Sequence, residues 1–198
     1  MSLRHILLGL AERECSGYDV KKEFDTSLRN FWRAELSQIY PQLQKLERDG
    51  LLESEKAESA QGPQRVVYRR TEAGEAVLKQ WLDGGPVVAT ERIAFLAQVY
   101  FLHELENDEQ RLEFMQMLRD YFEARVEHLQ SIHDQWSEKI DGFPDALPDE
   151  EFYPQLTLSC GLHRTTATLA WCDETIEKIR RRAADHAPPA KPTCRQAS

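Results

Sequence analysis

The chain has 198 residues, of which 30% are charged and 41% hydrophobic, and a formal net charge of −9. A chain of this length can build one large domain or two small ones, each with a core. It contains no apolar run near the roughly 20 residues of a membrane span, and its start lacks the length and cleavage site of a signal peptide. We therefore expect a cytoplasmic, helix-rich protein that makes no membrane contact.

The cysteines lack the paired spacing of a zinc site; they are Cys15, Cys160, Cys172 and Cys194. In a cytoplasmic protein we expect no disulfide, no metal and no cofactor. Cys160 and Cys172 fall in a predicted helix, where we expect both to be small buried apolar groups.

Residues 2–28 predict two helices. Apolar residues recur at helical spacing in residues 2–13 and again in residues 18–28, and Ser16-Gly17 separates the two segments.

Residues 37–49 predict a third helix. We expect Ser37 to be its N-cap and Pro41 to lie in its first turn, where a missing N–H costs little. Asp49-Gly50 ends the helix, because glycine adopts the left-handed conformation without steric cost.

A hairpin and a fourth helix follow. Leu51–Ala57 and Arg65–Arg70 predict two strands joined by a polar tip, and Thr71 is the expected N-cap of a helix to Asp83. Three helices, a hairpin and a further helix in this order are typical of a winged helix-turn-helix, a DNA-binding unit.

Gly84-Gly85-Pro86 marks the expected end of this first domain, which spans residues 1–85. Residues 86–186 predict an α-helical domain, with helices over 87–104, from Asn107 or Asp108 to about 140, and over 149–182. Residues 187–198 are rich in proline and predict a disordered tail. The expected fold class is mainly α.

The apolar residues of 107–140 recur in steps of three and four, as in a coiled coil. A helical arm this long cannot bury its stripe against an 85-residue domain, so we expect it to pack on a second copy; the alternative is a helical hairpin within a monomer. The expected dimerisation residues are Leu112, Met115, Phe122, Val126, Leu129, Trp136, Leu162, Leu169, Trp171 and Ile176.

Charge is unevenly distributed along the chain. Residues 1–85 hold 13 basic and 14 acidic residues, residues 86–198 hold 12 and 20, and residues 29–70 hold 8 and 6. The predicted DNA-reading segment is therefore mildly basic, which allows phosphate contact but predicts weak, salt-sensitive non-specific binding.

The first 85 residues resemble the PadR family of transcriptional regulators. The resemblance is carried by 5-HILLGL-10, 16-SGYD-19 with Lys21-Lys22, 37-SQIYPQL-43, 46-LERDGL-51, Val67-Tyr68 and 71-TEAG-74. The second half is similar to the helical C-terminal domain of the subgroup that includes virulence-gene activators, through its long helices and residues 171–176. The resemblance implies a dimer whose C-terminal helices clasp the partner, a function that is usually repression, and in several members release from DNA by a small aromatic or amphiphilic compound.

In such a protein, residues 37–49 are the recognition helix. Gln38 and Gln42 offer the paired donor and acceptor that adenine requires. We expect phosphate or base contacts from Ser37 and Tyr40, phosphate contacts from Tyr18, Lys21, Lys22 and Lys45, and wing contacts from Gln61, Gln64 and Arg65. The alternatives are a plain solvated helix face and, for Tyr40 or Tyr68, a place in the core.

An aromatic effector is the weaker expectation. Trp32, Phe95, Tyr100 and Phe101, together with Phe122 and Trp136, could line a cavity between the DNA-reading domain and the helical arms; the alternative is an ordinary core.

Two other classes of function compete with a repressor. No metalloprotease motif, phosphate loop or nucleophile elbow is present, so an enzyme is disfavoured. A winged helix that binds proteins instead of DNA, and a transcriptional activator, stay open as alternatives.

Overall fold

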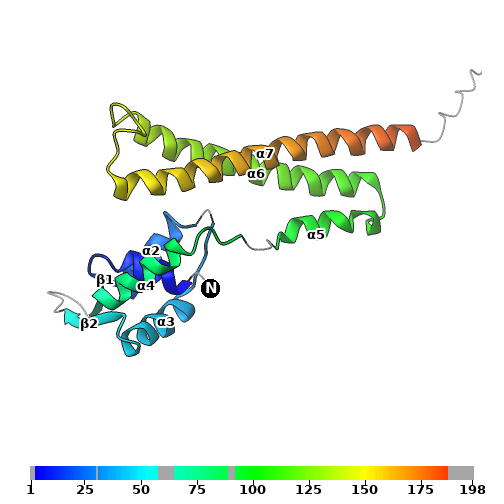
Figure 1. Cartoon of the computed structure of the whole chain (residues 1–198). Helices are drawn as coiled ribbons and strands as arrows, with labels where there is room; N and C mark the ends of the chain where they lie inside the picture. Colours follow the sequence, from blue (N-terminus) through cyan, green and yellow to red (C-terminus); the bar gives the residue numbers. More distant parts are fainter. Residues whose placement is uncertain (1–2, 30, 58–64, 89–91, 187–198) are drawn as a thin grey trace, which may run out of the picture. The chain divides into compact units, whose positions relative to one another are not determined.

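The computed structural model describes residues 3–29, 31–57, 65–88 and 92–186 (Figure 1). The chain divides into two compact units, Met1–Thr90 and Glu91–Ser198. The first unit contains α1 (Leu3–Leu10), β1 (Cys15–Ser16), α2 (Gly17–Asp25), α3 (Leu36–Arg48), β2 (Leu52–Ala57), β3 (Arg65–Arg70) and α4 (Glu72–Asp83). The second contains α5 (Ala94–Tyr100), the 3-10 helix η1 (Leu102–Glu104), α6 (Asp108–Ser137) and α7 (Asp149–His186).

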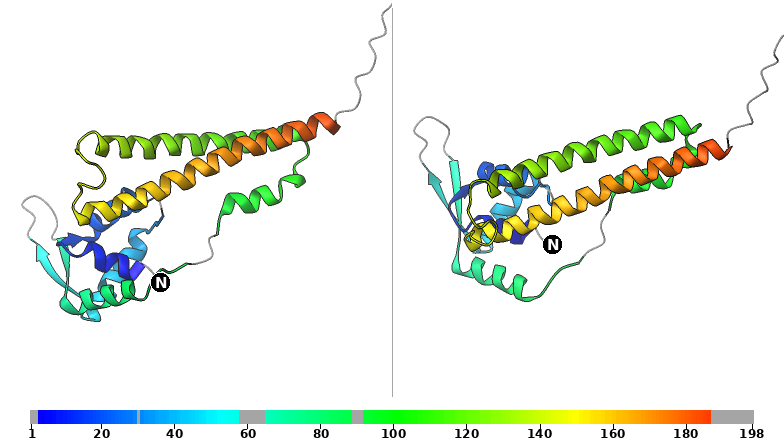
Figure 2. Two further views of the ribbon diagram at one scale, coloured as in Figure 1. Left: turned by 45° about the horizontal axis from the view of Figure 1, so that its top comes forward. Right: turned by 90° about the horizontal axis from the view of Figure 1, so that it is seen from above.

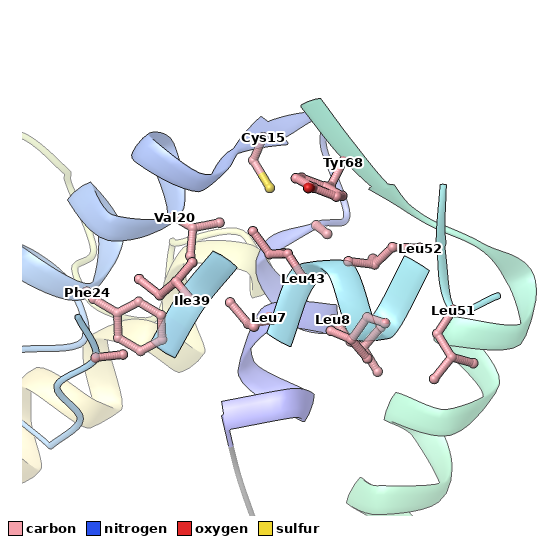
Figure 3. Packing of buried hydrophobic residues seen from close by; sticks show 13 residues of the cluster. Leu7, Leu8, Cys15, Val20, Phe24, Ile39, Leu43, Leu51, Leu52 and Tyr68 are labelled. Carbon is pink, nitrogen blue, oxygen red and sulfur yellow. The ribbon is translucent and has the colours of Figure 1, made fainter. Parts of the chain in front are cut away.

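The core of the first unit lies between α1, α2 and α3 and extends to the sheet (Figure 3). Each helix contributes fully buried apolar side chains: the neighbours Leu7 and Leu8 from α1, and residues at helical spacing from α2 (Val20 and Phe24) and from α3 (Ile39, Leu43 and Leu46). Burial of these stripes fixes α2 and α3 as a packed pair.

A capping box starts α2 one residue earlier than the sequence suggests. The Asp19 carboxylate accepts hydrogen bonds from the Ser16 N–H (2.8 Å) and the Ser16 hydroxyl (2.7 Å), and the Asp19 N–H donates to the Ser16 hydroxyl (3.3 Å). These hydrogen bonds lower the pKa of Asp19 below its ordinary value.

The N-cap of α3 is Glu35, so the prediction of Ser37 as the cap is wrong. The reason is that the Gln38 side-chain carbonyl accepts a hydrogen bond from the Glu35 N–H (3.1 Å), so the helix is capped two residues before Ser37. Pro41 consequently lies in the second turn instead of the first. The predicted end is confirmed: Gly50 has φ 71°, the Leu51 N–H donates to the Leu46 carbonyl and the Gly50 N–H to the Glu47 carbonyl, both at 2.9 Å.

The predicted hairpin is confirmed, with Leu52 opposite Arg70 and Ala57 opposite Arg65. The sheet has a third strand that the sequence did not reveal: β1 pairs antiparallel with β3, which gives the order β1-β3-β2. Two residues are too short for an alternating pattern to be visible. The strand joins the start of α2 to the base of the hairpin.

Thr71 caps α4 as predicted: its hydroxyl accepts the Gly74 N–H (3.1 Å) and donates to the Gly50 carbonyl (2.8 Å). Gly74 allows α4 to touch the backbone before β2, because a Cβ at this position would lie 2.2 Å from the Leu51 carbonyl oxygen. The end of α3, the root of the hairpin and the start of α4 thus meet at one joint.

The predicted helix over 87–104 is wrong in extent. Among the described residues of this range, 87–88 and 92–104, only Ala94–Tyr100 is α-helical, followed by the 3-10 helix Leu102–Glu104. Val87 and Val88 are exposed and precede the helix, so no packing offsets the low helix propensity of a β-branched pair. Asn107 caps α6 as predicted, since its side chain accepts the Gln110 N–H (2.9 Å).

Helices α6 and α7 lie side by side and antiparallel over most of their length (Figure 2). Met115 of α6 and Cys172 and Ile176 of α7 form the buried centre of this unit, and α5 adds Val99. Arg119 bridges the pair: its Nε lies 2.7 Å from Asp173 Oδ1.

The prediction of two buried cysteines in α7 holds for Cys172 but is wrong for Cys160, which is exposed. Along α7, Cys160 lies on the side away from the buried stripe that contains Leu158 and Cys172. Cys194 lies outside the described residues.

Candidate nucleic-acid interface

Helix α3 is buried on one side and exposed on the other. Ile39, Leu43 and Leu46 face the core. The exposed side carries polar and basic groups together with Tyr40 and Pro41: Ser37, Gln38, Gln44, Lys45 and Arg48. A helix packed by one stripe with hydrogen-bonding groups on the other suits insertion into the major groove.

The exposed side differs in part from the one expected from sequence. Gln42 is half-buried, on the flank between the outward and inward faces. Gln44 and Arg48 are exposed and were missed, although they lie one turn and two turns beyond Pro41, respectively, on the same helical face. Lys45 and Arg48 form no ion pair with any other described residue, so both cations are available to an anionic partner.

Two of the predicted contact residues are engaged within the protein. Lys21 Nζ lies 2.7 Å from Asp25 Oδ1 and 3.3 Å from Glu35 Oε2. These carboxylates, Asp25 first, raise the pKa of Lys21 above its ordinary value. Gln38 holds the Glu35 N–H, as described above. Lys22 is exposed and makes no ion pair with another described residue.

The tyrosines separate into two exposed residues and one core residue. Tyr18 lies in the first turn of α2 with 70% of its surface exposed, and Tyr40 is 43% exposed, whereas Tyr68 is 4% exposed. The Tyr40 ring lies directly over Gly17: a Cβ on Gly17 would be 2.5 Å from Tyr40 Cε1. Tyr40 is therefore fixed at the junction of α2 and α3 with part of its ring at the surface.

Strand β3 of the wing is tied to α2 by an ion pair. Arg65 at the start of β3 lies 3.7 Å from Asp19 Oδ2, and Arg69 pairs across the hairpin with Glu53 at 2.6 Å. Lys56 is exposed. The predicted tip residues Gln61 and Gln64 lie outside the described residues.

One face of the sheet is acidic. Glu14, Glu53 and Glu55 surround Arg69 at a hollow of about 250 Å³ over β2 and β3. With three carboxylates against one guanidinium, this face repels phosphate. Contact with DNA is consequently better served by the exposed side of α3, by Lys22 and by Arg65.

The residues predicted for dimerisation pack largely within the chain. Met115 and Ile176 are buried in the cluster between α6 and α7, Leu129 of α6 is also buried, and the other seven (Leu112, Phe122, Val126, Trp136, Leu162, Leu169 and Trp171) are half-buried. The stripe is thus shared between α6 and α7 of one chain, and its contact with a second copy stays a prediction. The large apolar side chains that α5 and α6 leave exposed are others: Leu96, Tyr100, Met117 and Tyr121.

The residues predicted for an effector fall in both units. Trp32 packs against the core of the first unit. Phe95 lies in the second unit, with its ring centroid 5.3 Å from that of Phe122 and 6.2 Å from that of Trp171. Tyr100 and Phe101 are exposed and lie edge to face, 5.0 Å apart.

Within the described ranges, no group of three or more His, Cys, Asp or Glu side chains is placed to hold a metal ion. The same residues contain no helix that is long and apolar enough to cross a membrane.

Two family profiles match the chain in succession. The profile "Transcriptional regulator PadR-like family" matches residues 6–80, and "Virulence activator alpha C-term" matches residues 91–180. Together they cover both structural units.

Two individual relatives are also named as transcriptional regulators. The chain is 28% identical over 179 residues to the "Negative transcriptional regulator PadR" of Bacillus subtilis, which covers 89% of this chain and 97% of the relative. It is 40% identical over 76 residues to the "Transcriptional regulator Rv3488" of Mycobacterium tuberculosis, covering 38% of this chain and 67% of the relative.

Solved structures show the same fold over nearly the whole chain. Bacillus subtilis PadR in complex with operator DNA has a TM-score of 0.77 at 26% identity and covers 90% of this chain and 99% of its own. The same protein in complex with p-coumaric acid gives 0.71 at 26%, covering 91% and 99%. The Vibrio cholerae virulence activator AphA gives 0.71 at 28%, covering 92% and 100%. The mainly helical fold with a winged helix and a long-helix domain is thereby confirmed.

Proposed function

Because this chain belongs to the PadR-like family of DNA-binding transcriptional regulators, we propose that it is a dimeric repressor that reads operator DNA with α3 and the wing. Membership also confirms the prediction of a regulator over an enzyme. The observation that carries the proposal is α3 itself, which buries Ile39, Leu43 and Leu46 on one side and exposes Ser37, Gln44, Lys45 and Arg48 on the other.

Different residues on and around α3 contact the bases and the phosphates. Ser37, Gln44 and Arg48 share the outward side of α3 and reach base edges, where the arginine fork suits guanine and the amide suits adenine. Lys45, Lys22 and Tyr18 contact phosphates, since each presents an exposed donor. Gln42 contributes from the flank, and Arg65 contacts the backbone at the wing.

Dimerisation occurs through the second unit. Four large apolar side chains are exposed in pairs one turn apart, Leu96 and Tyr100 on α5 and Met117 and Tyr121 on α6, and a second copy covers them. A dimer also supplies the two-fold symmetry of paired half-sites. Sedimentation of the wild type and of Met117→Lys/Tyr121→Lys tests this step: we expect a dimer and a monomer, respectively, with equal helix content. A monomeric wild type contradicts it.

A small aromatic acid is the proposed effector, supported by the structure of Bacillus subtilis PadR with p-coumaric acid. Trp32, Phe95, Tyr100 and Phe101 are the candidate contacts. Titration of p-coumaric acid and related hydroxycinnamates into the protein–operator complex should release DNA. Undiminished DNA binding across the series contradicts this part alone.

The main experiment is in vitro selection of DNA sites with the purified full chain. We expect an inverted repeat whose half-sites lie about one helical turn apart. Gln44→Ala and Arg48→Ala should each relax selection at a single base position, and Glu138→Ala, on the last turn after α6, provides a surface control. Failure to enrich any sequence contradicts the proposal.

Activation is the second candidate, because AphA, named as a virulence activator, matches 92% of this chain over the whole of its own length. Transcription in vitro separates the two. With the selected site placed over the core promoter, a repressor lowers transcript yield; with the site placed upstream, an activator raises it.

A further inference from the structure

The start of α3 is joined to α2 by polar contacts that centre on Lys21. Its ammonium is shared by Asp25 of the same helix (2.7 Å) and by Glu35 at the N-cap of α3 (3.3 Å). The Lys21 side chain is only 19% exposed, whereas that of Glu35 is 72% exposed. The lysine side chain is therefore largely covered, while the glutamate with which it pairs stays at the surface.

Glu35 is also held from the other side. Its N–H donates to Gln38 Oε1 at 3.1 Å, and the Gln38 N–H donates to the Glu35 carbonyl at 2.8 Å. Lys21, Glu35 and Gln38 thus form a continuous connection from α2 into the first turn of α3, which we call the α2–α3 brace.

The brace places a carboxylate at the N-terminus of α3, the helix that is proposed to enter DNA. The N-terminus of a helix attracts anions through its free N–H groups and its dipole. In an exposed helix next to DNA, the nearest anions are backbone phosphates. Glu35 occupies this position with a negative charge of its own, so a phosphate at the start of α3 is repelled.

From this arrangement we propose that Lys21, Glu35 and Gln38 are positioning residues for sequence readout. The brace holds the first turn of α3 in one register, so that Ser37 and Gln44 meet base edges, and Glu35 excludes phosphates from the helix start. Sequence selectivity then comes partly from weakening non-specific binding. The inference rests on DNA binding by α3.

The brace and a direct phosphate contact by Lys21 predict different binding data. A lysine that neutralises a phosphate contributes equally to specific and non-specific affinity, and its loss lowers the salt slope of binding by about 0.9. A lysine in the brace changes the ratio of specific to non-specific affinity and leaves the salt slope unchanged.

The adjacent Lys22 is a matched control, because it is exposed on the same helix and makes no ion pair with another described residue. The experiment measures affinity for the selected operator and for a scrambled duplex, at several salt concentrations, with Lys21→Met, Lys22→Met, Glu35→Gln and the Lys21→Met/Glu35→Gln double variant. Circular dichroism confirms that each is folded.

For Lys21→Met and for Glu35→Gln we expect the ratio of specific to non-specific affinity to fall roughly fivefold, and the double variant to fall no further. Glu35→Gln should also bind the scrambled duplex more tightly than the wild type does. Lys22→Met should lose affinity for both duplexes equally and lower the salt slope.

A second readout needs no DNA. Amide hydrogen exchange in residues 36–39 should accelerate in Lys21→Met and Glu35→Gln but not in Lys22→Met. The proposal is overturned if Lys21→Met behaves as Lys22→Met in both measurements, or if Glu35→Gln leaves the ratio unchanged. If the wild type selects no DNA site at all, the proposed function fails first, while exchange still tests whether the brace orders α3.

Discussion

Replacing Gly74 with alanine should destabilise the first unit, although alanine is the better helix former. A Cβ at position 74 would lie 2.2 Å from the Leu51 carbonyl oxygen and 3.1 Å from its carbon. Both atoms belong to the backbone and cannot swing aside. Since ordinary contacts begin near 3.4 Å, α4 and the root of the hairpin must separate by about 1 Å.

The separation strains a joint with several hydrogen bonds. The same Leu51 carbonyl accepts the Thr71 N–H at 3.2 Å, and Thr71 caps α4. Overpacking costs about 2 kcal/mol and a weakened hydrogen bond about 1 kcal/mol, against a gain of about 1 kcal/mol from helix propensity. The free energy of unfolding should therefore fall by about 2 kcal/mol.

Urea denaturation followed by tryptophan fluorescence measures this change. In a Trp136→Phe/Trp171→Phe background, Trp32 and Trp81 report on the first unit alone. Gly9→Ala is the control within α1, because an added Cβ there has nothing within 4 Å, and it should raise stability by roughly 0.5–1 kcal/mol. A Gly74→Ala protein as stable as the wild type would refute the reasoning.

Three further predictions concern the two units separately. Arg119→Met should lower the urea midpoint of the second unit, because it removes the guanidinium from both Glu123 and Asp173. Adding Asp173→Asn should recover part of the loss, because it removes one of the two carboxylates that lost this partner. Because the pKa of Asp19 is lowered in the folded protein, its carboxylate contributes fully to stability above the unfolded pKa near 3.8, and this contribution is lost as pH falls through the folded value. The urea midpoints of wild type and Asp19→Asn should therefore differ at pH 6 and converge below about pH 4. Midpoints that differ equally at both pH values would contradict this. Gly17→Ala should displace the Tyr40 ring and weaken operator binding. Its loss of stability should be smaller than that of Gly74→Ala, because the half-exposed Tyr40 side chain can move whereas the Leu51 backbone cannot. An operator affinity equal to that of the wild type would show that Tyr40 does not contact DNA.

Local signals with a clear physical cause were sufficient for much of the fold. Thr71 and Asn107 were recognised as N-caps because each has a short polar side chain directly before an apolar helical pattern. Gly50 ended α3 because only glycine takes a positive φ there without strain. The start of α3 was missed since glutamate ranks low as a cap, and its place depends on a reciprocal partner at Gln38.

Tertiary packing decided what the sequence could not. Val87 and Val88 are as apolar as any helix stripe, but they are exposed, and the helix begins later. For the interface, the outward side of α3 follows from the helical period, which would have favoured Gln44 over Gln42 had the buried stripe been used to orient the helix. That Lys21 is engaged by Glu35 could not be predicted, because the two are joined by the packing of α2 on α3.

The central claim is that two copies of the exposed face of α3 read one DNA site. Hydroxyl-radical footprinting of the full chain on its selected site tests it most directly. We expect two protected segments related by two-fold symmetry and about 34 Å apart, both weakened to the same extent in Arg48→Ala. A single protected segment, or protection that Arg48→Ala leaves unchanged, would contradict it.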